Sequence, residues 1–146
     1  MKRHFESPIV LLGARLLSPY IMVFGWYVIF HGHYSPGGGF QGGALLAASV
    51  LLIRVAGGAH LGNLQIKEWV NNPIAAIGVL IYFGTGLVAA LAGGYFLDYG
   101  ELPIPGVEAA WLRYIGILII EVGIGLTVMA VLVMIYDNIV TGEDND

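Results

Sequence analysis

Ionisable side chains inside long apolar runs are the residues of this sequence that could do chemistry. Glu121 is the one acidic residue deep in such a run, about nine residues after the run begins near Leu112. A rise of about 1.5 Å per residue places it roughly 13 Å from one end, near the middle of a hydrocarbon core about 30 Å thick. A carboxyl group at that depth needs a partner or a hydrated cavity, and we expect the partner to come from another subunit or from water. Glu121 is therefore either a relay for protons or cations, or a structural hydrogen-bonding group.

Basic side chains in the first two apolar runs are the other candidates. His31 and His33 flank Gly32 at the end of the first run, and histidine titrates near neutral pH and can pass protons, although a histidine bonded to the backbone is the alternative. A metal site would need a third ligand, and no cysteine or nearby carboxylate supplies one, so no metal is expected. Arg15 and Arg54 lie closer to the ends of their runs, and we expect their long side chains to snorkel to the interface. For Arg15 the alternative is a buried pairing, which keeps it among the candidates for an ion relay or a buried polar group.

The composition indicates an integral membrane protein. Of the 146 residues, 58% are hydrophobic and 11% are charged, whereas an ordinary soluble domain has about 25% charged residues. Cysteine is absent, which excludes disulfides, iron–sulfur clusters and thiolate zinc sites carried by this chain alone. No pairing of a nucleophile with a base is visible in the sequence. We therefore expect no cofactor and no catalytic residue, and hence a protein that is not itself an enzyme.

Four apolar segments predict an all-α protein with four transmembrane helices in a single membrane domain over residues 1–146. The helices are expected at about 8–30, 40–56, 73–96 and 112–139, each long enough to span. Residues 62–72 are polar and amphipathic, which favours a short interfacial segment. Basic residues gather at the N-terminus and between the second and third helices (Lys2, Arg3, Arg54 and Lys67). The positive-inside rule therefore predicts that both termini are cytoplasmic.

The loop between the first two helices is rich in glycine. Its residues Pro36, Gly37, Gly38, Gly39, Phe40, Gly42 and Gly43 combine a fixed turn with positions that have no side chain. Glycine allows another backbone to approach closely, so we interpret the loop as a structural and assembly element. Phosphate binding is the alternative, but it would need a lysine or a helix N-terminus aimed at the phosphate, and no Lys or Arg lies between Arg15 and Arg54.

Small residues predict where the later helices pack closely. On the last helix, Gly116, Gly123 and Thr127 share one face, whereas Glu121 and Gly125 share another. Small residues let membrane helices approach each other. We interpret the two faces as one contact with the same chain and one contact with another subunit.

The glycine loop also carries a family resemblance. Positions 32–43 read Gly-His-Tyr-Ser-Pro-Gly-Gly-Gly-Phe-Gln-Gly-Gly, which resembles the first loop of the MnhB-type subunit of Mrp-type sodium/proton antiporters. The stretch 101–106 is similar to the Leu-Pro-Ile/Val-x-Gly loop before the last helix of that family. Glu121-Val122-Gly123-Ile124 resembles a stretch that has Asp most often at the acidic position and valine at the last.

The resemblance implies a small subunit of an Mrp-type cation (Na+)/proton antiporter, with a structural or coupling role in the ion-translocating module. Its partners would be other membrane subunits, the lipid bilayer, and Na+ and H+ moving through the complex, with no nucleic acid. It would lie in the plasma (inner) membrane of a prokaryote. Two alternatives stay open, namely the equivalent subunit of a membrane-bound hydrogenase or related respiratory complex, and a self-sufficient small channel or transporter.

Overall fold

The structure, a computed structural model, describes residues 7–34 and 37–143. Four long helices account for most of these residues, namely α1 (Pro8–Phe30), α2 (Gly39–Gln65), α3 (Glu68–Leu91) and α4 (Ala109–Glu143), and a short 3-10 helix, η1 (Tyr99–Glu101), precedes α4. In this part of the chain each long helix is apolar and long enough to cross a membrane, and no strand forms. The prediction of an all-α protein with four membrane-spanning helices is confirmed.

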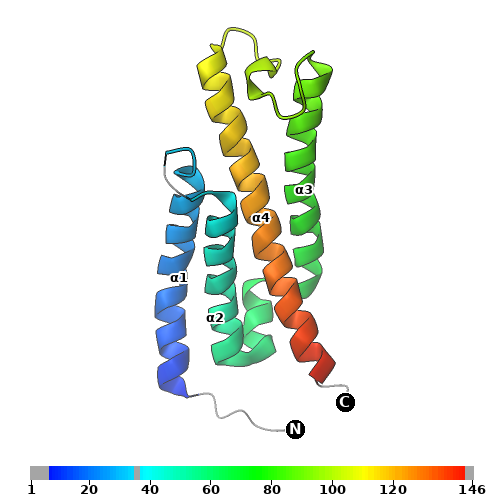
Figure 1. The fold of residues 1–146 in the computed structure, drawn as a ribbon. Coiled ribbons are helices and arrows are strands. Elements are labelled where there is room, and N and C mark those ends of the chain that lie inside the picture. The colour runs from blue at the N-terminus through cyan, green and yellow to red at the C-terminus, as the bar shows by residue number, and fades with distance from the viewer. Residues whose placement is uncertain (1–6, 35–36, 144–146) are drawn as a thin grey trace.

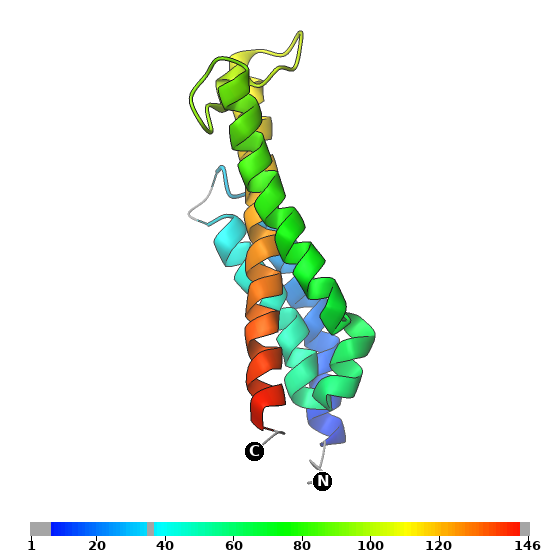
Figure 2. The ribbon, with the colours of Figure 1, turned by 90° about the vertical axis from the view of Figure 1, so that its right-hand side faces the viewer.

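Helix α4 lies between two neighbours (Figure 1). The antiparallel α1–α2 hairpin packs on one side of α4, and α3 packs on the other. The main core forms where the hairpin meets α4, and its buried members are Ile29, Leu46, Ala47, Val50, Met129 and Val133. Figure 2 shows that α3 and α4 extend together past the α1–α2 turn, so the bundle is stepped at that end.

Both small-residue faces of α4 contact this chain itself. A Cβ atom on Gly78 of α3 would lie 2.5 Å from the carbonyl oxygen of Gly123, and one on Gly43 of α2 would lie 2.7 Å from that of Gly125. The expectation that one face meets another subunit is therefore wrong, because the α1–α2 hairpin occupies the face that carries Gly125.

The bounds of three helices differ from those expected. Helix α2 continues past residue 56 to Gln65 through a kink at Gly58, where φ is +71°, a conformation that glycine adopts without steric cost. Helix α3 begins at Glu68 with Pro73 inside it, and it ends at Leu91 rather than near 96. Helix α4 begins three residues earlier than expected and continues to Glu143. Residues 62–72 are largely helical rather than a separate segment, because α2 continues to Gln65 and α3 begins at Glu68.

Candidate functional site

Glu121 of α4 reaches the first turn of α2. The backbone N–H of Gly39, the first residue of α2, donates a hydrogen bond to Glu121 Oε2. The first N–H groups of a helix have no partner within the helix, and its dipole favours negative charge there. Glu121 therefore caps α2 from another helix. The partner in this structure is a backbone group of the same chain, where we expected another subunit or water.

Three glycines leave the space that this contact needs. A Cβ atom on Gly38 would lie 2.6 Å from Glu121 Cδ, one on Gly32 would lie 3.1 Å from the same atom, and one on Gly39 would lie 2.8 Å from Ile124 Cβ. Such separations are shorter than, or at the short limit of, real Cβ contacts. Side chains at these positions would therefore push the carboxyl group away from the start of α2.

Other residues of the predicted loop contribute differently. Gly42 brings α2 close to α1, because a Cβ atom there would lie 2.7 Å from the carbonyl oxygen of Gly25. The Phe40 side chain is 68% exposed. Pro36 lies outside the described residues. The glycines of the loop therefore serve contacts with both α1 and α4.

The carboxyl group of Glu121 lies where α1 ends and α2 begins. Helix α1 has 23 residues and is therefore about 34 Å long, close to the thickness of a hydrocarbon core. The span in α3, Trp69–Leu91, is equally long, and α3 and α4 extend together past the α1–α2 turn (Figure 2). The mid-membrane depth of Glu121 therefore stays a prediction.

His33 lies on the same side of α4 as Glu121, nearer to the start of α4. Its ring meets the Tyr114 ring edge-on, with centroids 4.5 Å apart, and Tyr114 precedes Glu121 by two helical turns, or about 10 Å. His33 Nε2 is buried and has no hydrogen-bond partner. His33 also lines a hollow of about 370 Å³ with Trp111 and Arg113; we call this the His33 hollow. An unpartnered buried nitrogen beside a hollow is a place for water or a proton to bind.

The remaining two candidates lie elsewhere. His31 stacks on Tyr27 with ring centroids 4.1 Å apart, and its Nδ1 lies 2.9 Å from the Tyr27 carbonyl oxygen. Arg15 is exposed on the first half of α1, toward the opposite end of the bundle. The structure therefore places His33 and Glu121 on one face of α4, and it does not bring Arg15 to them.

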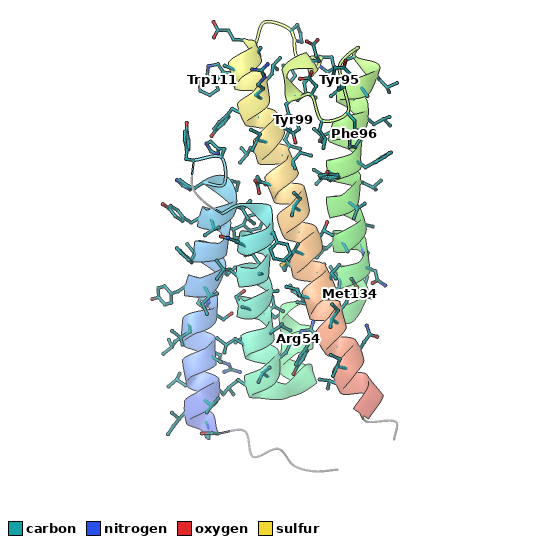
Figure 3. All side chains as sticks on the ribbon, viewed as in Figure 1. Arg54, Tyr95, Phe96, Tyr99, Trp111 and Met134 are labelled. Atoms are coloured by element: carbon teal, nitrogen blue, oxygen red, sulfur yellow. The ribbon has the colours of Figure 1, made fainter. Side chains whose placement is uncertain are left out.

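The charge of Glu121 affects Tyr99, which lies on the far side of α4. Tyr99 of η1 packs on Gly116, where a Cβ atom would lie 2.7 Å from the tyrosine ring (Figure 3). Burial raises the pKa of Tyr99 above its usual value, and electrostatic interactions with Tyr82 and with Glu121 raise it further. Among the described residues, no three histidine or acidic side chains gather in a way that could hold a metal ion.

Sequence reasoning missed a buried ion pair. The Arg54 side chain is only 2% exposed, forms a salt bridge with Asp137 of α4, and donates a hydrogen bond of 2.7 Å to the Ile66 carbonyl oxygen (Figure 3). The expectation that Arg54 snorkels is wrong, because α2 continues past its kink and covers this side chain. Gly62 leaves room for the aliphatic part of Arg54. Two opposite charges in separate apolar runs were the available signal, since buried charges pair.

Comparisons with known proteins find similarity to antiporter subunits and to a chain of a respiratory complex. A family model described as a domain related to the MnhB subunit of Na+/H+ antiporter matches residues 9–134. The B-type subunit of the Na(+)/H(+) antiporter of Alkalihalophilus pseudofirmus is 32% identical over 136 residues, which is 87% of this chain and 94% of that protein. A chain in the structure of the membrane-bound sulfane sulfur reductase, an archaeal respiratory membrane complex, has a TM-score of 0.73 and 31% identity, covering 95% of this chain and 60% of that one.

Some relatives are considerably longer than this chain. An uncharacterised protein of Methanocaldococcus jannaschii is 35% identical over 91 residues, which is 62% of this chain but 34% of that protein. The chain therefore spans about a third of that relative and three fifths of the matched chain in the respiratory complex.

Proposed function

Because this chain belongs to the family of domains related to the MnhB subunit of Na+/H+ antiporters, we propose that it is a non-catalytic membrane subunit of a multisubunit Na+/H+ antiporter. The family match and the antiporter relative both support this role. The four apolar helices fit a multi-pass protein of a prokaryotic plasma membrane, since the relatives come from bacteria and archaea. Other membrane subunits would be its partners.

Within that role, we propose that Glu121 relays protons, and the hydrogen bond from Gly39 to its carboxyl group carries the proposal. The N-terminus of α2 offers a backbone N–H group and the positive end of a helix dipole, and both interact with a carboxylate more strongly than with a neutral carboxyl group. Protonation weakens this contact. The arrival of a proton at Glu121 therefore loosens the α1–α2 turn on α4, which couples proton binding to a movement between helices.

The His33 hollow supplies the route in this proposal. His33 is one of its lining residues, and the Nε2 atom of His33 is buried. Two helical turns of α4 separate Tyr114, on which His33 packs, from Glu121. A water molecule bonded to His33 Nε2 would begin a chain of hydrogen bonds toward the carboxylate, as in other intramembrane relays. His33 would act here as a positioning group for water.

The experiment compares Glu121→Gln, Glu121→Leu and the control Glu108→Gln, which changes an exposed acidic residue before α4. The complex is purified, reconstituted in vesicles and tested for Na+-driven proton transport and for subunit stoichiometry. A relay predicts that the Gln variant assembles and loses transport by about tenfold or more, since general acid–base groups contribute about 10²–10⁴-fold. The control should transport normally. An assembled and fully active Gln variant, with assembly impaired only by Leu, would show that Glu121 is structural.

A respiratory complex is the second candidate, and the match to a chain of the sulfane sulfur reductase complex favours it. In that setting the chain would serve the ion-translocating part of the complex, while other subunits would carry the redox centres. Purification in mild detergent distinguishes the two candidates. Co-purified iron–sulfur proteins support the respiratory complex, and a purified complex with antiport activity but without iron supports the antiporter.

A further inference from the structure

A groove on the outside of the α1–α2 hairpin changes from polar to apolar along its length. It has a volume of about 390 Å³ and is lined from α1 by Arg15, Ser18, Pro19 and Met22, and from α2 by Ile53, Leu61 and Gln65. We call it the Arg15 groove. Arg15 and Met22 lie two helical turns apart on one face of α1, so about 10 Å of helix separates the charged end from the apolar end.

The polar end of the Arg15 groove carries hydrogen-bonding groups that could bind a ligand. Arg15 is exposed although it lies within an apolar span, and no acidic side chain that the structure describes is within salt-bridge distance of it. Pro19 has no N–H to donate to the Arg15 carbonyl oxygen, so this oxygen lacks its usual helical partner. The Gln65 amide makes only a long contact of 3.5 Å to Ser18 Oγ. In a membrane such groups need partners.

We propose that the Arg15 groove binds one anionic phospholipid. The phosphate binds the Arg15 guanidinium, and one acyl chain lies along Met22 and Ile53. A headgroup hydroxyl donates to the Arg15 carbonyl oxygen, and an ester oxygen accepts from the Gln65 side-chain N–H. A guanidinium forms strong, charge-assisted hydrogen bonds to phosphate. The order of charge, polar groups and hydrocarbon in the groove is the order found along a phospholipid. A transmembrane helix of another subunit would instead have to place its own carboxylate opposite Arg15.

The first test measures lipid retained by the full-length chain after delipidation in detergent. Phosphatidylglycerol or phosphatidylcholine is added, and bound lipid is counted by native mass spectrometry. We expect phosphatidylglycerol to bind more tightly, with about a tenfold loss in Arg15→Gln and recovery in Arg15→Lys. The matched control is Arg113→Gln, which removes an exposed arginine near the other end of the bundle and should bind normally. Equal losses in the two glutamine variants would overturn the proposal, because the binding would then follow overall charge.

The second test identifies the occupant in the assembled complex and does not depend on stability. A photoreactive diazirine residue replaces Met22 at the apolar end of the Arg15 groove, in membranes that contain the other subunits. Cross-links to phospholipid support the proposal. Cross-links that go mainly to another protein subunit overturn it and assign the groove to a subunit interface.

Discussion

Replacing Asp137 with leucine should destabilise the bundle strongly, because it removes the partner of a charge that has almost no access to solvent. The Arg54 side chain is 2% exposed, and that of Asp137 is 15% exposed. Removing one partner of a buried ion pair costs about 3–5 kcal/mol. At about 2–4 °C per kcal/mol for a chain of this size, the melting temperature should fall by about 6–20 °C.

The double variant, in which Arg54 and Asp137 are both leucine, shows whether the cost comes from the stranded charge. Well-packed apolar residues often replace a buried ion pair with little loss. We therefore expect the double variant to melt closer to the wild type than Asp137→Leu does, with a coupling energy of at least about 2 kcal/mol. The hydrogen bond of Arg54 to the Ile66 carbonyl oxygen is also lost in this variant, which limits the recovery.

Unfolding of each variant is followed by circular dichroism in one detergent, with Glu108→Leu as the control for removing an exposed acid. That control should lie within about 0.5 kcal/mol of the wild type. The reasoning is refuted if Asp137→Leu melts like the control. It is also refuted if the double variant is destabilised, relative to the wild type, by the sum of the effects of Arg54→Leu and Asp137→Leu, since the two charges would then act independently.

Two further predictions concern the other side of α4. Gly78→Ala places a Cβ atom 2.5 Å from the Gly123 carbonyl oxygen and should lower the free energy of unfolding by about 1–3 kcal/mol, measured by thermal unfolding. The control Gly84→Ala meets nothing within 4 Å and should be neutral or stabilising. Equal effects of the two substitutions would contradict the packing of α3 on α4. The raised pKa of Tyr99 means that the folded chain holds the phenol proton more tightly than the unfolded chain, so stability should be unaffected below about pH 9 and should fall as the pH rises above about 10. Tyr99→Phe should reduce this fall in unfolding curves measured at a series of alkaline pH values. Glu121→Gln should lower the Tyr99 pKa in an ultraviolet titration. A titration that Glu121→Gln leaves unchanged would contradict the contribution of the Glu121 charge to the Tyr99 pKa.

The sequence predicted the elements of this fold better than their partners. Apolar runs identify membrane-spanning helices because lipid offers no other partner for the backbone. Periodicity likewise identified two packing faces on α4, but it says nothing about what covers each face. The α1–α2 hairpin covers one of them, and that depends on contacts between residues far apart in sequence, such as Gly43 and Gly125.

In the candidate site, too, the sequence identified the residues but not how they are arranged in space. Glu121 and His33 stand out by residue type in an apolar chain, and the glycine loop stands out by composition. Their meeting at the start of α2 required the three-dimensional arrangement, because Gly39 and Glu121 are 82 residues apart. The buried state of Arg54 depended in the same way on the kink at Gly58, which a helix expected to stop near residue 56 does not contain.

The stepped end of the bundle also bears on the bilayer around this chain. The spans in α1 and α3 each have 23 residues, and α3 extends past the α1–α2 turn (Figure 2). Two spans of equal length that are offset in this way match one flat hydrocarbon core only when the helices tilt or the bilayer changes its thickness locally. The bilayer beside the α1–α2 turn should therefore differ in level from the bilayer beside α3.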